Sequence, residues 1–204
     1  CSHELRRRAE KVVGNLIKCN PHWRQETEEQ PEPPTECFQE FQTFLRSLIR
    51  EKDREQRFLQ NKYVDYARFR RMWHLHFSKN RRGKNIGPDL SWHVIRTYIK
   101  GTNSEDYLEP EEYDCLPRKQ KSVSLETFAN VYEIVWESWY KGLCEQQGYW
   151  DDQDLARHLF DTDRIQPVYP AIFCDEAQDF TRIELDLLFR LCLFSDRKLA
   201  HTDI

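Results

Sequence analysis

Apolar residues recur every three or four positions through most of this chain, and that spacing constrains its fold more than any other feature. The clearest case is residues 125–147, where one helical face would carry Phe128, Val131, Tyr132, Val135, Trp136 and Trp139. This period is that of an amphipathic α-helix. The same spacing predicts helices over residues 38–59, 63–77, 90–99 and 155–160, with an interruption near residue 61. Most of the chain is therefore predicted to be helical.

Residues that favour helix ends stand where these segments begin. They are Asp89, Pro110, Ser124, Asp151 or Asp152, and Thr181 with Glu184 three residues later. Short polar side chains accept hydrogen bonds from the free amides of a first turn, and proline fits that turn because it lacks an amide hydrogen. Gly101 is expected to end the helix of residues 90–99.

The composition excludes membrane-spanning and disordered classes of protein. Of the 204 residues, 32% are charged and 13% aromatic, and no apolar run approaches the length that spans a bilayer. The seven cysteines are spread out without a CxxC pair, which argues against a disulfide framework or a zinc site. We therefore expect reduced thiols and an intracellular protein. Because the first residue is Cys1 rather than methionine, we also expect a piece of a larger protein.

The period changes near the end of the chain. Residues 168–174, VYPAIFC, form a short apolar run rich in β-branched and aromatic side chains, without polar alternation. Such a run is typical of a buried strand in a parallel sheet. A single strand cannot pair its own backbone, so this one needs partner strands that the rest of the chain hardly offers.

A basic segment lies within a chain of slightly negative net charge. Residues 46–84 contain 13 Lys or Arg and 4 Asp or Glu, interleaved with aromatic rings. This composition is typical of a nucleic-acid surface, and the candidate contact residues are Arg68, Arg70, Arg71, Arg81, Arg82 and Lys84. The rings also keep helical spacing, so the alternative interpretation is a buried aromatic stripe with the arginines on its solvated face.

The sequence Asp175-Glu176-Ala177-Gln178-Asp179-Phe180-Thr181 follows the apolar run directly. Ligands bind at the carboxyl ends of strands in open α/β sheets. Of two adjacent acids there, one can hold Mg²⁺ while its neighbour orients or deprotonates a water. An acidic loop that merely caps the next helix would explain Asp179 and Thr181, but not the two carboxylates that end an apolar strand.

The string VYPAIFCDEAQDFT closely resembles motif II, the Walker B element, of superfamily 1 DNA helicases of the UvrD/Rep type. The resemblance implies that Asp175 coordinates the Mg²⁺ of MgATP and that Glu176 is the catalytic residue that activates water. Gln178 and Asp179 would link the nucleotide site to neighbouring motifs. Residues 90–101 and the acidic pairs that follow also resemble the helical 1B region of this family. The cofactors implied are ATP and Mg²⁺, and the partner implied is single-stranded or forked DNA, with RNA left open.

The fold class expected is mainly α, with a helical subdomain followed by a strand-loop-helix slice of a RecA-like P-loop NTPase α/β domain. Residues 1–36 would form an N-terminal helix and a Pro- and Glu-rich linker, residues 37–163 the 1B-like subdomain, and residues 164–204 part of the RecA-like domain. The remaining RecA-like domains would be partners in the same longer chain.

Two departures from the family bear on activity. A phosphate-binding loop needs GxxxxGK[ST], but the only Gly-Lys is Gly83-Lys84, which Asn85 follows. His201-Thr202-Asp203 stands where motif III would have its Gly-Asp. We therefore expect the fragment alone to be inactive, within a parent protein that hydrolyses ATP.

Two other functional classes remain open. One is a non-enzymatic helical module that binds nucleic acid or an acidic protein through residues 46–84. The other is a metal nuclease that uses Asp175, Glu176 and Asp179, although such sites usually gather carboxylates from several strands. His74, His76 and His93 are expected at the surface or in packing rather than at a metal, because HxH on a helix points the two rings apart.

Overall fold

The structure is a computed structural model that describes residues 7–8, 10–15, 39–78, 86–162, 165–170, 172–174 and 176–193. The chain divides into two compact units, Cys1–Leu48 and Ile49–Ile204. Pairing between extended segments is limited, within the described residues, to two isolated bridges that join Tyr63 to Trp150 and Tyr169 to Cys192. The prediction of a mainly α chain is confirmed.

The described part of the first unit is helical. Residues 7–8 and 10–15 have helical backbone. Helix α3 spans Phe41–Leu48, with Leu45 fully buried. The apolar pattern predicted over residues 38–59 is interrupted after this helix, because Arg50 is extended and caps the next one, α4.

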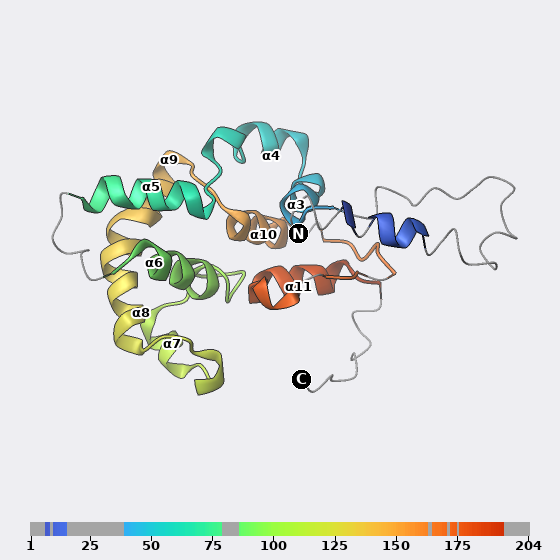
Figure 1. The fold of residues 1–204 in the computed structure, drawn as a ribbon. Helices are drawn as coiled ribbons and strands as arrows, with labels where there is room; N and C mark the ends of the chain where they lie inside the picture. The colour runs from blue at the N-terminus through green and yellow to red at the C-terminus, as the bar shows by residue number, and fades with distance from the viewer. Residues whose placement is uncertain are drawn as a thin grey trace, which may run out of the picture. The chain divides into compact units, whose positions relative to one another are not determined.

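The second unit contains the remaining helices (Figure 1). Their bounds are α4 Glu51–Gln56, α5 Tyr66–Phe77, α6 Pro88–Val94, α7 Pro110–Cys115, α8 Leu125–Val131, α9 Lys141–Gln147, α10 Asp152–Asp161 and α11 Arg182–Leu191. Short 3₁₀ turns lie at Gln60–Lys62, Arg118–Gln120 and Ala177–Asp179. Among the described residues of both units, no helix is long and apolar enough to cross a membrane.

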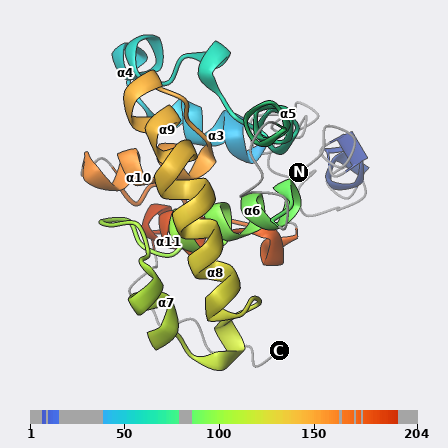
Figure 2. The same ribbon diagram turned by 90° about the vertical axis from the view of Figure 1, so that its left-hand side faces the viewer.

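The predicted segment of residues 125–147 forms one continuous helical run. Helices α8 and α9 are joined by the π-helical stretch Tyr132–Tyr140, and α6 likewise continues into the π-helical stretch Ile95–Ile99. Figure 2 shows the long run passing in front of α6 and beside the end of α5. Lys100 directly follows the first π-helical stretch, and Tyr140 is the last residue of the second. Both side chains are fully buried, so a charged group and a phenol lie in the core at the ends of these wide turns.

Aromatic rings form much of the core of this unit. Phe69, Trp73 and Phe77 on one face of α5 are buried, which confirms the interpretation of the aromatic spacing as a packed helix face. The Phe69 ring centroid lies 5.0 Å from that of Trp92 and 5.1 Å from that of Tyr140. Burial of such rings is the largest favourable contribution per residue to a core.

The predicted helix starts are mostly confirmed. Ser124 accepts a hydrogen bond from the Thr127 amide at 3.1 Å, and Asp151 accepts from the amides of the first turn of α10. The exception is Asp89, which lies inside the first turn of α6, because Gly87 caps that helix and Pro88 occupies its first position. A proline there needs no hydrogen-bond acceptor.

The buried strand predicted for residues 168–174 is not formed. Its described residues, 168–170 and 172–174, have no strand partner beyond the bridge at Tyr169. Phe173 is 95% exposed and Val168 55% exposed. A strand requires neighbours for its amide and carbonyl groups along its whole length, and the described residues pair only Val168 and Tyr169, with Leu191 and Leu193.

Candidate functional site

The loop between the apolar run and α11 makes a tight turn at the surface. Glu176 has left-handed backbone (φ 52°), and the 3₁₀ turn Ala177–Asp179 follows it. The amide of Asp179 donates to the carbonyl of Glu176 at 2.9 Å, and the Gln178 side-chain amide donates to the Glu176 carboxylate. Glu176, Gln178 and Asp179 are exposed, whereas Asp175 lies outside the described residues. The loop therefore presents carboxylates to solvent.

A buried carboxylate connects helix α11 to α10 and to the π-helical stretch Ile95–Ile99. Glu184 is fully buried and accepts from the amide and hydroxyl of Thr181 at 2.6 and 2.9 Å, which completes the predicted capping box. The Gln153 side-chain amide donates to it at 2.8 Å, and Arg96 Nη2 lies 3.1 Å from both carboxylate oxygens. Burial raises the pKa of Glu184, and Arg96 and the Thr181 donors oppose that rise.

A second buried ionic group lies at the start of α10. Lys100 is fully buried, and its Nζ lies 2.5 Å from Oδ2 of Asp151 and 2.5 Å from Oδ2 of Asp154. The Tyr140 hydroxyl donates to Asp151 at 3.4 Å. Burial alone would lower the pKa of Lys100, but the two carboxylates reverse this effect and raise it. The ammonium group is therefore charged, and it joins the end of one helix to the start of another.

The carboxylate of Asp152 lies in an environment that raises its pKa. Its Oδ2 accepts from the Tyr63 hydroxyl at 3.3 Å, while its Oδ1 is buried without a hydrogen-bond partner in the described part of the chain. Burial, followed by repulsion from Glu184 and Asp151, raises the pKa of Asp152 to about 7. A shift of this kind can mark a catalytic acid or base, but here burial and the neighbouring carboxylates of Glu184 and Asp151 explain it.

Metal-binding geometry is absent from the described residues: no three His, Cys, Asp or Glu side chains come together as a metal site would require. Asp175, the residue expected to hold Mg²⁺, is outside that set. The acids of residues 151–154 instead cap α10 and pair with Lys100. Glu176 and Asp179 remain the accessible oxygen donors of the predicted site.

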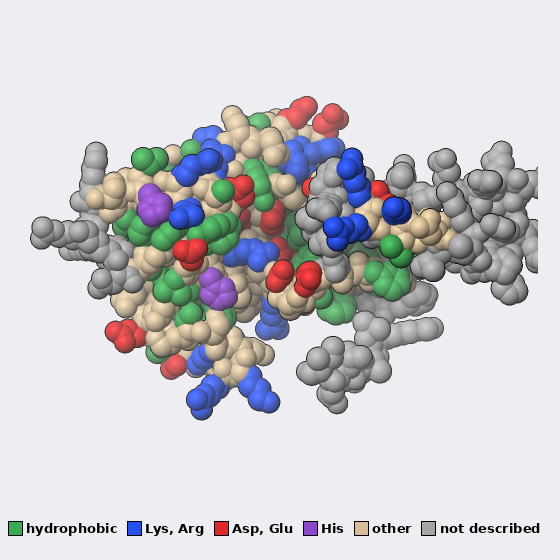
Figure 3. All heavy atoms as spheres, in the orientation of Figure 1, with side chains coloured by type: hydrophobic (Ala, Val, Ile, Leu, Met, Phe, Trp, Pro, Cys, Tyr) green, Lys and Arg blue, Asp and Glu red, His purple; other side chains and the backbone are tan. Residues whose placement is uncertain are grey.

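The candidate nucleic-acid residues have different environments. Arg68 Nη1 donates to the carbonyls of Asn61 and Tyr63 at 2.6 and 2.7 Å, so it stabilises the start of α5. Arg70 and Arg71 are exposed on α5. The other three, Arg81, Arg82 and Lys84, lie outside the described residues. On the face drawn in Figure 3, basic and acidic side chains are interspersed over the second unit.

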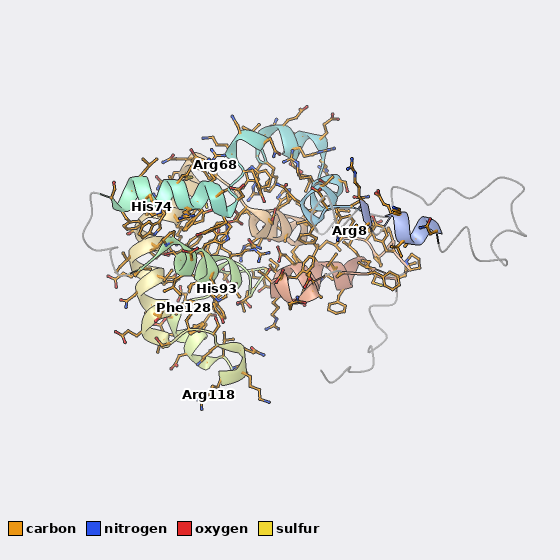
Figure 4. The ribbon with its side chains drawn as sticks, in the orientation of Figure 1. Arg8, Arg68, His74, His93, Arg118 and Phe128 are labelled. Carbon is orange, nitrogen blue, oxygen red and sulfur yellow. The ribbon has the colours of Figure 1, made fainter. Side chains whose placement is uncertain are left out.

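The three histidines considered as metal ligands, His74, His76 and His93, have packing or surface positions. His74 is exposed on α5, and His76 stacks on Trp139 with ring centroids 4.9 Å apart. His93 on α6 pairs with the Ser122 hydroxyl at 2.8 Å. Figure 4 shows His74 and His93 on these separate helices.

Sequence reasoning missed Arg96, Lys100 and Gln153. Lys100 had a usable signal, because it directly follows the apolar pair Tyr98 and Ile99 on a predicted buried helix face. No comparable pattern singles out Arg96 or Gln153. Their carboxylate partner, Glu184, lies 88 and 31 positions away along the chain.

Comparisons with known proteins do not place the chain in a family. No family model matches it, and no solved structure matches it. It is similar to the human "TPR and ankyrin repeat-containing protein 1", with 28% identity over 137 residues. That region is 63% of this chain but only 4% of the human protein. The chain thus corresponds to a small part of that relative.

Proposed function

We propose that this chain is a segment of a UvrD-like superfamily 1 DNA helicase or translocase. The observation that carries the proposal is the sequence VYPAIFCDEAQDFT, in which an apolar run, two carboxylates and a helix cap follow one another. The capping box of Thr181 and Glu184 starts α11 directly after this string, which supports the proposal. The parent protein would couple ATP hydrolysis to movement along single-stranded DNA.

The donor chemistry of the loop fits the carboxylate part of an MgATP site. Mg²⁺ prefers carboxylate oxygens and water, and the described acids of the loop, Glu176 and Asp179, are exposed. Bound MgATP supplies the phosphoryl group to be cleaved and a divalent charge. Asp175 would hold the metal, and Glu176 would orient a water and accept its proton. The sequence contains no phosphate-binding loop, so another part of a longer protein would have to provide it.

The apolar run of residues 168–174 supports a second part of the proposal. Its described residues are apolar and mostly exposed, and a single bridge pairs Tyr169 with Cys192. We infer that this run becomes a strand of a RecA-like sheet when neighbouring strands of the longer protein are present. Residues 37–163 would then be the helical insertion that precedes it.

The experiment is Glu176→Gln in the full-length protein that contains this chain. Loss of a general base lowers turnover by about 10²–10⁴-fold, and nucleotide binding should be kept because the amide retains the shape of the side chain. The matched control is Asp186→Asn, an exposed acid of α11 outside the motif. Unchanged ATP turnover in the Glu176 variant would refute the proposal.

A second candidate function rests on the exposed pair Arg70 and Arg71. They belong to the basic segment of residues 46–84 and lie on the solvent side of α5. A non-enzymatic module would bind single-stranded DNA through such cations, with affinity that falls as salt rises. Charge reversal of both arginines should then abolish binding, while Glu176→Gln should leave it unchanged. Binding that is insensitive to both changes contradicts this candidate.

A further inference from the structure

Arg96 joins the loop that carries Glu176, Gln178 and Asp179, named the DEAQD loop after its sequence, to the π-helical stretch after α6. It lies in the π-helical stretch Ile95–Ile99, and its guanidinium contacts two residues that follow the apolar run, Asp179 and Glu184. Nη1 donates to the carbonyl of Asp179 at 3.0 Å, and Nη2 contacts both carboxylate oxygens of Glu184 at 3.1 Å. One side chain therefore holds both the loop and the helix that follows it.

The carboxylate side of this link is rigid. Glu184 is fully buried, and Thr181 and Gln153 also donate to it, so its position is fixed from three elements. A buried carboxylate needs a cation or strong donors. Among the described residues, Arg96 is the cation that forms a salt bridge with Glu184. Its planar fork binds two acceptors in one orientation, which a lysine cannot reproduce.

A close backbone contact keeps the two segments in register. The amide of Ile183 donates to the carbonyl of Gly101 at 3.0 Å. A Cβ on Gly101 would lie 2.9 Å from Cβ of Thr181 and 2.2 Å from the carbonyl oxygen of Arg96. Only glycine allows this approach, so the start of α11 sits directly against the end of the π-helical stretch.

The link continues to Glu176 through the backbone of one residue, Asp179. Arg96 binds the carbonyl of Asp179, and the amide of Asp179 donates to the carbonyl of Glu176 at 2.9 Å. Glu176 is the described non-glycine residue with positive φ. Left-handed backbone is unfavourable for a residue with a Cβ and persists only where surrounding contacts enforce it. The hydrogen bond from the Asp179 amide is such a contact, and Arg96 binds the carbonyl of that same residue.

We propose that Arg96 is a positioning residue that holds Glu176 in its left-handed conformation and thereby aims its carboxylate. The catalytic consequence rests on the proposed function, whereas the effect on the loop does not. Without Arg96 the Asp179 carbonyl loses its donor, the turn of residues 176–180 opens, and Glu176 relaxes to ordinary backbone. A carboxylate displaced by about 1 Å lowers turnover by about 10²-fold without a change in substrate affinity.

The test measures backbone hydrogen exchange of residues 176–181 and ATP turnover in the intact protein. Arg96→Ala should speed exchange by about tenfold or more and lower kcat with KM unchanged, and Arg96→Lys should recover part of both. Because Arg96→Ala leaves Glu184 buried without a cation, the double variant Arg96→Ala/Glu184→Gln is measured with it. The matched control is Arg157→Ala, since Arg157 binds the carbonyls of residues 103, 105 and 106 and not the loop.

The outcomes separate this inference from the proposed function. Unchanged exchange in both Arg96→Ala and the double variant Arg96→Ala/Glu184→Gln overturns the inference. Faster exchange with normal turnover, in a protein that Glu176→Gln inactivates, also overturns it. If Glu176→Gln leaves turnover unchanged, the proposed function fails, and the exchange data alone decide whether Arg96 holds the loop.

Discussion

Replacement of Lys100 by methionine removes the single cation from a buried ionic group. Its ammonium lies 2.5 Å from carboxylate oxygens of Asp151 and Asp154, and the lysine side chain has no exposed surface. Methionine has similar length and keeps the packing, so the change isolates the charge. The two acids then remain buried or nearly buried without their counter-ion.

The expected loss of unfolding free energy is about 3–5 kcal/mol, the usual cost of leaving a buried charge without its partner. For a protein of this size, about 1 kcal/mol corresponds to a change of about 2–4 °C in Tm. The midpoint should therefore fall by about 6–20 °C. Urea unfolding followed by circular dichroism, together with thermal scans at pH 8, measures both quantities.

Two further measurements identify charge as the cause. Adding Asp154→Asn to the Lys100 variant should recover part of the stability, because one stranded carboxylate is removed. The deficit of the single variant should also shrink as the pH falls. Burial, followed by repulsion from Asp151, already raises the pKa of Asp154 to about 6, so a proton can neutralise it in the folded state. A loss below about 1 kcal/mol at pH 8, or a deficit that is the same at pH 5, would refute the reasoning.

Three other outcomes are expected. Asp152→Asn should reduce the fall in stability between pH 5 and pH 8 by at most about 1.4 kcal/mol per pH unit, measured by urea unfolding. The sign follows from the pKa of about 7, because the folded state then binds a proton that the unfolded chain releases near pH 4. Gly101→Ala should cost about 1–3 kcal/mol, seen as a lower thermal midpoint, because its Cβ would lie 2.2 Å from a carbonyl oxygen. Ser124→Ala should cost about 1 kcal/mol in the same assay, since it removes the cap of α8.

Much of the helical structure was predictable because its causes are local. The capping box of Thr181 and Glu184, the cap at Ser124 and the aromatic face of α5 each involve residues within a few turns of one another. The site was less predictable. The motif located Glu176, Gln178 and Asp179, but nothing in the local pattern indicated that an arginine far along the chain would contact their loop.

For the apolar run of residues 168–174, the sequence predicts an element that the structure does not contain. Its composition predicts a buried strand, but its described residues form no strand beyond one bridge, and Phe173 is almost fully exposed. Composition reports only how well side chains suit a strand. Whether the strand forms depends on partner strands, which the described residues do not contain.

The amino-acid sequence by itself determined which segments become helices, where most of them begin, and which acids stand together in the DEAQD loop. Only the tertiary structure decided that Lys100 is buried against Asp151 and Asp154 and that Arg96 connects that loop to Glu184. The physical reason is the separation along the chain between the residues that interact. Helix periodicity and capping depend on neighbours within about four residues, whereas a buried charge is stable only where folding brings its partner from 50 to 90 residues away.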